Sequence, residues 1–306
     1  MKTAKTPYFF HDKPLFGLDI GHGSLKAMQL SESSLEPGKQ PRIVGYGFAT
    51  FDRAAQENGV IVQPEIIAKA AHDLFKNHLI GDITTRRVAL AIPAYRTYTR
   101  SLQLPKLKSS ELAEAVRLEA EQYISLPLED LYLDYDIIRQ TEDKTELFVV
   151  AVPKTIVDSY LELAQILGLE TVLIEPTLSS SGRLFSIGEL SDVATVIIDF
   201  GSLSSDISIF DKHVLVTGTV QSGGFIFTQS IKQALGVSIE EAALIKTRYG
   251  LGVSKKQAEI KQAIEPKLQD IVKEIRRMLR YYEERYGQQR PVGQIISLGG
   301  GALRFE

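Results

Sequence analysis

The chain has 306 residues, of which 44% are hydrophobic and 24% charged, and its formal net charge is −3. This length can bury a large core divided into two or more lobes, and the small net charge does not favour nucleic acid or an acidic membrane as the main partner. The absence of cysteine excludes disulfides and thiolate metal sites. No apolar run approaches the roughly 18 residues that span a bilayer, and residues 1–13 lack a signal-peptide core, so we expect a cytoplasmic protein.

The first part of the chain reads as strands interrupted by one helix. Two apolar runs flank a glycine-rich turn, and a third run follows a polar loop. Helical spacing with an early Pro64 marks the helix. The expected elements are strands at 15–20, 25–30, 42–51 and 86–93 and a helix at 63–79.

A different pattern follows over about residues 94–152. Its order is strand, helix, strand, strand, which is typical of a compact α+β unit inserted into the surrounding pattern. The helix is predicted to start near Ser109 or Ser110, before Glu111 and a run of periodic apolar residues. The expected elements are strands at 97–105, 131–140 and 145–153 and a helix at 109–124.

The remainder alternates strands and helices again, and a second strand–turn–strand opens at residue 193. A long helix is predicted over 265–287 with Pro266 in its first turn, and a final strand within 292–303 runs into three glycines. The other expected elements are helices at 154–168, 176–185, 223–236 and 238–250 and strands at 171–176, within 193–211 and at 213–221.

Two segments resemble each other, LFGLDIGHGSLKAMQL near the start and VIIDFGSLSSDISIF about 180 residues later. Each has a strand, an Asp-x-Gly triplet, a short polar turn and an outgoing strand. Glycine lets the backbone approach an anion closely, and several N–H groups can then point at one phosphate. An aspartate at the strand end can hold Mg²⁺ through water, and Lys26 adds a point charge.

Each piece alone also fits an ordinary structure. A single Asp-x-Gly is often a plain turn, Lys26 could be a solvated surface lysine, and SLGGGA could be a loose terminus or a Rossmann-like turn without its helix. Independent turns would seldom occur in the observed order, in which a DxGxGxxK hairpin precedes IEP, DxGxxSxD and a strand into GGGA. The order favours a nucleotide site.

This ordered set resembles the actin-like ATPase superfamily, which includes actin, the Hsp70 chaperones, sugar kinases and the division protein FtsA. DIGHGSLK is similar to the phosphate-1 loop, IEP to the connecting segment, IIDFGSLSSD to the phosphate-2 loop and IISLGGGA to the adenosine loop. The inserted unit is similar in place and order to the extra subdomain of FtsA. Its segment RSLQLPKLKSSELAEAVRLEAEQYISLPLEDLYLDY, with EEAALIKTRYG and EIRRMLRYYEERYG, resembles the PilM-like proteins of type IV pilus assembly.

The resemblance implies an α/β actin-like ATPase fold, in which two RNase H-like lobes clasp ATP and Mg²⁺ and carry an FtsA/PilM-type inserted α+β subdomain. The C-terminal end is expected to be truncated relative to the family, shortly after the adenosine loop. The implied divisions are a first lobe at 1–93 and 153–192, the subdomain at 94–152, and a second lobe at 193–306 with a helical subdomain at 224–290.

The resemblance also implies site residues. Asp19 and Asp199 would act in catalysis and lie near the metal, and Glu175 matches a polar position that can orient the attacking water; Glu175 is equally compatible with a strand-end role. The residues implied to bind the nucleotide are Gly21, His22, Gly23, Ser24 and Lys26, then Gly201, Ser202, Ser204, Gly223, Gly224 and Lys246, and finally Gly299, Gly300 and Gly301.

Two positions depart from the family pattern. His22 and Gly23 stand where small hydroxyl residues are usual, and His22 could contact a phosphate or point outward. Ala243 stands three residues before Lys246, where an acid is common, so a ribose contact is absent or supplied by Glu240 or Glu241.

By resemblance, the protein would be an ATP-binding scaffold of the type IV pilus inner-membrane complex. It would bind the cytoplasmic N-terminal peptide of a PilN-like membrane protein, close its lobes on nucleotide, hydrolyse ATP slowly or not at all, and form a homo-oligomer or ring. The location implied is the inner face of the cytoplasmic membrane, reached through the partner. The alternatives are an FtsA-like filament-forming division ATPase and a small-molecule kinase of the same superfamily; the kinase lacks an evident acid to accept a substrate proton.

Overall fold

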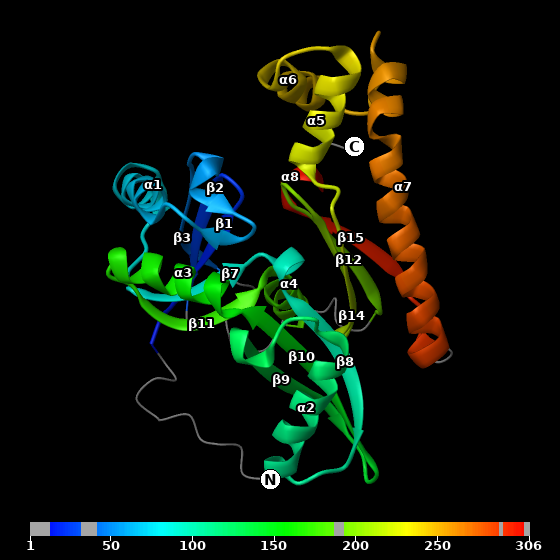
Figure 1. Ribbon diagram of the computed structural model, residues 1–306. Helices are drawn as coiled ribbons and strands as arrows, with labels where there is room; N and C mark the ends of the chain where they lie inside the picture. Colours follow the sequence, from blue (N-terminus) through cyan, green and yellow to red (C-terminus); the bar gives the residue numbers. More distant parts are fainter. Residues whose placement is uncertain (1–12, 32–41, 187–192, 288–289, 303–306) are drawn as a thin grey trace. The chain divides into compact units, whose positions relative to one another are not determined.

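The computed structural model describes residues 13–31, 42–186, 193–287 and 290–302 (Figure 1). It divides into two compact units, one formed by residues 1–93 and 154–176 and the other by residues 94–153 and 177–306. The chain passes between the units three times, each time directly after a proline, at Pro93, Pro153 and Pro176. Among the residues that the structure describes, no helix is long and apolar enough to cross a membrane.

The first unit is built on a six-stranded mixed sheet of order β11-β7-β1-β2-β3-β6. β1, β7 and β11 run parallel, whereas β2 and β3 run antiparallel to their neighbours. The strands are β1 (Phe16–Gly21), β2 (Ser24–Leu30), β3 (Ile43–Thr50), β6 (Leu79–Gly81), β7 (Arg87–Ile92) and β11 (Glu170–Pro176), and a small hairpin adds β4 (Gln56–Glu57) and β5 (Val60–Ile61).

Helices α1 (Pro64–Asn77) and α3 (Lys154–Ile166) pack against each other and against this sheet. Pro64 stands in the first turn of α1, where its missing N–H costs nothing. The buried residues of α1, Ile67, Ala68, Ala71 and Leu74, recur at helical spacing. The alternating pattern of β1 buries Phe16, Leu18 and Ile20 in the core and leaves Asp19 off it.

The inserted segment forms a three-stranded antiparallel sheet of order β8-β10-β9, with one helix. The elements are β8 (Tyr98–Pro105), α2 (Ser109–Tyr123), β9 (Leu131–Gln140) and β10 (Lys144–Pro153), which confirms the predicted order. α2 begins at Ser109, as predicted, and the backbone N–H of Lys108 donates to the Glu111 carboxylate at 3.1 Å. Its buried residues Leu112, Val116 and Ala120 recur every four positions and face the sheet.

The second sheet has the order β14-β13-β12-β15. Its strands are β12 (Thr195–Phe200), β13 (Ser205–Asp211), β14 (His213–Val220) and β15 (Gln294–Leu298). β12 and β15 run parallel, and β13 is antiparallel to both β12 and β14. The first sheet contains the same arrangement in β3-β2-β1-β7, so the likeness between the two halves extends from a short motif to four strands.

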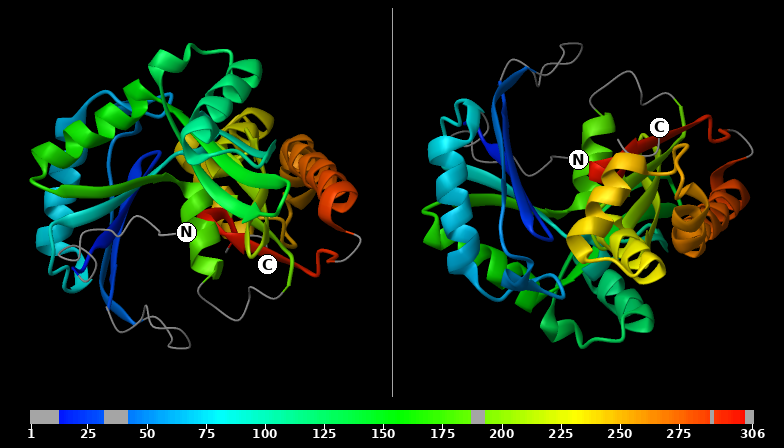
Figure 2. Two further views of the ribbon diagram at one scale, coloured as in Figure 1. Left: turned by 90° about the horizontal axis from the view of Figure 1, so that it is seen from below. Right: turned by 90° about the horizontal axis from the view of Figure 1, so that it is seen from above.

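Besides α2, the described part of the second unit contains the helices α4 (Thr177–Ser186), α5 (Gly224–Leu235), α6 (Ile239–Tyr249), α7 (Gln257–Tyr282) and α8 (Gly299–Ala302). Helix α7, orange in Figures 1 and 2, packs against α5, β13 and β14. The predicted start of α7 is wrong, because the helix begins at Gln257 and Pro266 lies inside it. Ile260 and Ile264, buried in the core before the proline, account for the extra turns. The glycine run was not predicted to be helical, yet α8 begins at Gly299.

The inserted sheet is joined to the rest of the second unit by hydrogen bonds between β8 and β14. The Ser101 hydroxyl donates to the backbone carbonyl of Leu215 at 2.5 Å, and the hydroxyls of Thr99 and Thr217 lie 2.8 Å apart. These contacts hold together two segments more than a hundred residues apart in sequence.

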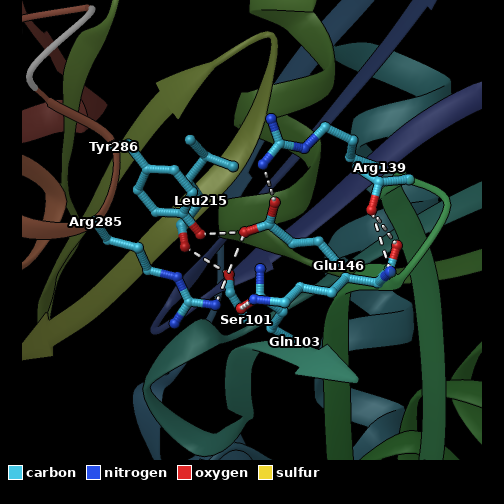
Figure 3. A network of polar contacts seen from close by, with 9 residues as sticks. Ser101, Gln103, Arg139, Glu146, Leu215, Arg285 and Tyr286 are labelled. Atoms are coloured by element: carbon cyan, nitrogen blue, oxygen red, sulfur yellow. Dashed lines mark hydrogen bonds and ion pairs between the residues drawn. The ribbon is translucent and has the colours of Figure 1, made fainter. Parts of the chain in front are cut away.

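A buried carboxylate makes a second connection, shown in Figure 3. Glu146 on β10 is 4% exposed and accepts a hydrogen bond from the Tyr286 hydroxyl, just beyond the end of α7. Arg139 and Arg285 approach the same carboxylate at 3.6 and 3.9 Å. Burial and the bond to Glu146 raise the pKa of Tyr286, so the phenol keeps its proton. These partners compensate the buried charge of Glu146 and link β10 to the segment that follows α7.

Candidate nucleotide site

The β1–β2 hairpin carries the first predicted phosphate loop in the turn from Gly21 to Ser24. Asp19 lies opposite Lys26 in the register, and the Lys26 ammonium contacts the Asp19 carboxylate at 2.7 Å. Gly23 has φ +93°, a left-handed conformation that favours glycine. Its carbonyl accepts the backbone N–H of Phe51 at 3.1 Å, which attaches the turn to the end of β3.

Glu175 lies in the same row of the first sheet as Asp19. Ala91 on β7 is the register partner of both residues, so all three stand at one level on three parallel strands. Two strand spacings separate Asp19 from Glu175, about 10 Å between their Cα atoms. Residues paired in register project from the same face of a sheet. The sheet therefore places these two predicted catalytic residues at the same end of its parallel strands and on the same face.

His22, at the top of the turn, is partly buried. Burial first, and the nearby charge of Arg53 second, lower the pKa of the imidazole, so His22 is neutral at pH 7. Arg53 was not found by sequence reasoning. It stands 30 positions after Gly23, yet an ideal Cβ on Gly23 would lie 2.7 Å from the Arg53 Cγ. Only the pairing of β3 with β2 brings it there, and no local sequence pattern indicates it.

The β12–β13 hairpin carries the second predicted phosphate loop, from Gly201 to Ser204. Asp199 stands at the position in this hairpin that Asp19 has in the first. Its register partner on β13, however, is Asp206, where Asp19 has a lysine. An ideal Cβ on Gly201 would lie 2.9 Å from the carbonyl oxygen of Ser204, so the turn is tight enough to require glycine. Ser204 itself is buried.

Asp206 is the second residue to which sequence reasoning gave no role. It is 8% exposed, and burial raises its pKa to about 6, with a smaller contribution from the Asp199 charge. A hydrogen bond from the Thr219 hydroxyl at 2.8 Å opposes this rise. The acid that closes DxGxxSxD was the available signal, since it sits opposite the first acid of a two-stranded hairpin.

Gly223 and Gly224 place the start of α5 directly on this second turn. The N–H of Gly224 donates to the Gly201 carbonyl at 2.9 Å, and the N–H of Phe225 to the Ser202 carbonyl at 2.8 Å. A Cβ on Gly223 would lie 2.4 Å from the Ser202 carbonyl oxygen, which only glycine avoids. The second unit therefore brings Gly201, Ser202, Gly223 and Gly224 together.

Lys246 on α6 reaches the same place, and its ammonium donates to the carbonyl of Gly224. Glu241 is engaged elsewhere, because its carboxylate accepts the Ser238 N–H at 3.0 Å while the Ser238 hydroxyl accepts the Glu241 N–H at 3.1 Å. This reciprocal capping box starts α6. It assigns Glu241 a structural role.

The glycines after β15 meet the second hairpin at Asp199. Gly299 has φ +82°, and its ideal Cβ would lie 2.5 Å from both an Asp199 carboxylate oxygen and the Phe200 carbonyl. A Cβ on Gly300 would have open space around it. Gly301 lies in α8 with them. The adenosine-loop segment thus packs directly against the carboxylate predicted to hold the metal.

The residues present fit a nucleotide and a hydrated cation in part. The turns offer backbone N–H groups and glycines, which suit a polyphosphate. Across the described ranges, no group of three or more His, Cys, Asp or Glu side chains could by itself hold a metal ion. Mg²⁺ normally takes one or two carboxylates together with waters and phosphate oxygens, so a single strand-end aspartate in either unit suits the ion only together with a nucleotide.

Comparisons with solved structures give the fold. The chain matches the PilM–PilN type IV pilus biogenesis complex with a TM-score of 0.78 and 24% identity, covering 95% of this chain and 83% of that one. It matches the ethanolamine utilization protein EutJ from Carboxydothermus hydrogenoformans at 0.53 with 14% identity, covering 95% and 78%. It matches MreB5 of Spiroplasma citri bound to AMPPNP with a TM-score of 0.52 and 14% identity, covering 95% of this chain and 86% of that one. The predicted actin-like ATPase fold is confirmed.

Two sequence comparisons place the chain more narrowly. It is 22% identical over 261 residues to the cell division protein FtsA of Neisseria meningitidis serogroup B (strain ATCC BAA-335 / MC58), which covers 76% of this chain and 61% of that protein. The chain thus spans less than two thirds of this relative. The family model described as type IV pilus assembly protein PilM matches residues 17–304. The chain therefore belongs to the PilM family of type IV pilus assembly proteins.

Proposed function

We propose that the protein is an ATP-binding scaffold of a type IV pilus assembly complex. The observation that carries the proposal is the repeated hairpin. Two sheets of the same strand order each present an aspartate, a glycine turn and an outgoing strand at equivalent positions. Family membership supplies the biological setting, and the fold relative MreB5 was solved bound to AMPPNP.

In this proposal each hairpin supplies one side of the site. Asp19 and Asp199 hold Mg²⁺ through water, and Lys26 exchanges its contact with Asp19 for a phosphate oxygen. Lys246 and the glycines after β15 hold the nucleoside end. The remaining contacts to phosphate come from Gly21, His22, Gly23, Ser24, Gly201, Ser202, Ser204, Gly223 and Gly224. The contacts to the nucleoside come from Gly299, Gly300 and Gly301.

Hydrolysis is proposed to be slow or absent. Glu175 is the carboxylate proposed to orient an attacking water, since it stands in the same row as Asp19. Because nucleotide binds groups from both units, it stabilises the arrangement in which both can reach it, and this differential affinity closes the lobes. The nucleotide thereby controls the shape of a scaffold.

The proposed partner is the cytoplasmic N-terminal peptide of a PilN-like inner-membrane protein. The support is the PilM–PilN complex, which the chain matches over 95% of its length. Binding this peptide would bring the protein to the inner face of the cytoplasmic membrane, where copies assemble into a homo-oligomer or ring. Fluorescence anisotropy with such a peptide is expected to show binding that persists at high salt, and no binding at high micromolar concentration would contradict the partner.

The nucleotide is tested by calorimetry of ATP with Mg²⁺. Asp199→Ala is expected to weaken binding at least tenfold, which corresponds to about 1.4 kcal/mol for one lost carboxylate interaction. Asp136→Ala, which removes an exposed aspartate from β9, is the matched control and is expected to leave affinity unchanged. Equal affinity of Asp199→Ala and the wild type would remove Asp199 from the site.

The similarity to FtsA favours one second candidate, a filament-forming ATPase. Sedimentation with ATP and lipid vesicles separates the two. Filaments that pellet with vesicles in the absence of any partner would support the FtsA-like function. A protein that stays in the supernatant until the partner peptide is attached to the vesicles would support the scaffold.

A further inference from the structure

Arg53 is held beside the first phosphate turn by the backbone around it. β2 and β3 pair with Ser24 opposite Thr50, so β3 ends level with the turn. The Phe51 N–H then donates to the Gly23 carbonyl at 3.1 Å. Asp52 accepts the N–H of Ala54 at 2.9 Å and caps a short 3₁₀ helix that starts at Arg53. The backbone position of Arg53 is therefore determined on both sides.

The side chain of Arg53 lies against the glycine of the turn. Its Cγ and Nε are 2.7 and 3.3 Å from the place where a Cβ of Gly23 would stand. Any other residue at position 23 would therefore meet this arginine as well as the unfavourable φ of +93°. Gly23 thus gives the arginine stem access to the turn backbone, in addition to forming the turn.

The residues of the turn itself supply little net positive charge. Lys26 forms an ion pair with Asp19 at 2.7 Å, and the two charges offset each other. His22 is neutral at pH 7, because burial and the charge of Arg53 lower the pKa of its imidazole. A polyphosphate carries several negative charges, and a guanidinium can bind phosphate oxygens with two parallel N–H bonds.

We propose that Arg53 binds the phosphate groups of the nucleotide at the Gly21–Ser24 turn, as a cation contributed from outside the predicted loop. This inference rests on the proposed nucleotide-binding function and adds a residue to the same site. The planar fork of the guanidinium suits phosphate oxygens that also accept backbone N–H groups of the turn. His22 then acts as a neutral donor beside this cation, which accounts for its departure from the family pattern.

Titration calorimetry with ATP·Mg²⁺, ADP·Mg²⁺ and adenosine tests the proposal on the full chain. Arg53→Gln is expected to weaken ATP and ADP binding tenfold or more and to leave adenosine binding unchanged, since hydrogen bonds to charged groups contribute more than neutral ones. Arg53→Lys keeps the charge and most of the stem but loses the fork, and is expected to fall between Arg53→Gln and the wild type. Arg86→Gln is the matched control for loss of an arginine charge, because Arg86 is exposed and lies just before β7, at the end of that strand away from the Gly21–Ser24 turn.

The outcomes separate this inference from the function on which it rests. ATP binding by the wild type with equal affinity in Arg53→Gln would overturn the role of Arg53 and leave the nucleotide site standing. An equal loss of ATP and adenosine binding in Arg53→Gln would also overturn it, because the effect would then be on the fold of the turn. No ATP binding by the wild type would contradict both. A thermal unfolding curve for each variant confirms that the compared proteins are folded.

Discussion

The two hairpins that carry the predicted phosphate loops, β1–β2 and β12–β13, share a strand arrangement but differ in charge. In the first, the strand-end acid Asp19 pairs with a lysine; in the second, Asp199 pairs with another acid, Asp206. The first pair is solvent-exposed and forms an ion pair at 2.7 Å. Of the second pair, Asp206 is buried and has a raised pKa. A repeated fold thus fixes where two side chains stand, whereas the residue types determine whether the position attracts an anion, a cation or a proton.

The neighbouring strand shows the same kind of difference. Asp19 pairs with Ala91 on β7, and the next residue, Ile92, is buried in the core. Asp199 pairs with Leu298 on β15, and the next residue, Gly299, lies directly against the Asp199 carboxylate. The first hairpin is therefore backed by ordinary apolar packing. The second is backed by a glycine that leaves no space for a side chain.

The largest expected effect is that of Gly299→Ala, which would break the packing peculiar to the second hairpin. The new Cβ meets a carboxylate oxygen and a backbone carbonyl at 2.5 Å and a φ of +82°. We expect a loss of about 3 kcal/mol in the free energy of unfolding. Gly300→Ala, with open space at the same loop, is expected to lie within about 0.5 kcal/mol of the wild type. Chemical denaturation measures both, and equal effects would contradict the close contact.

Asp206→Asn tests the cost of burying this acid, to which the nearby charge of Asp199 adds a smaller part. The native pKa of Asp206 is about 6 against an ordinary value of 3.8, so the native state binds more protons than the unfolded state between these values. Stability is therefore lost as the pH rises from about 4 to 6, and the ionised side chain weakens the fold above 6. We expect Asp206→Asn to stabilise the protein by roughly 2 kcal/mol at pH 8 and by little at pH 4. A gain that does not depend on pH would contradict this explanation.

The equivalent glycines Gly21 and Gly201 sharpen the comparison. A Cβ on Gly21 would have ordinary contacts of 3.6 Å or more, whereas a Cβ on Gly201 would lie 2.9 Å from a carbonyl oxygen. We expect Gly201→Ala to cost about 1–2 kcal/mol and Gly21→Ala less than about 0.5 kcal/mol. Melting temperatures of the two variants measure the difference. Equal melting temperatures would show that the second turn is no tighter than the first.

The smallest expected effect on stability is that of Lys26→Gln. Both partners of the Lys26–Asp19 pair are exposed, and surface ion pairs contribute little because water and salt screen them. We expect the free energy of unfolding to change by less than about 0.5 kcal/mol. Because Lys26 is proposed to contact phosphate, we expect ATP affinity to fall at least tenfold. Loss of stability without loss of ATP affinity would reverse the role assigned to Lys26.

Much of this architecture was predictable because its signals are local. Asp19, Gly21 and the alternation of buried residues in β1 define a strand and turn within eleven residues, and Gly223 and Gly299 each begin a recognisable run of glycines. Arg53 was missed because its position depends on how β3 pairs with β2, whereas Asp206 was missed although the last acid of DxGxxSxD marks it. The start of α7 was missed because Pro266 resembles a helix start, whereas burial of Ile260 and Ile264 outweighs the hydrogen bond that the proline removes.

The central proposal is that both hairpins take part in binding one nucleotide with Mg²⁺. A double-mutant cycle of Asp19→Asn and Asp199→Asn, measured by ATP calorimetry with Mg²⁺ and with EDTA, tests it most directly. We predict that each substitution weakens binding about tenfold in Mg²⁺, that the two effects are not additive because they share one ion, and that both shrink in EDTA. Additive effects of equal size with and without Mg²⁺ would show that the hairpins do not share a metal.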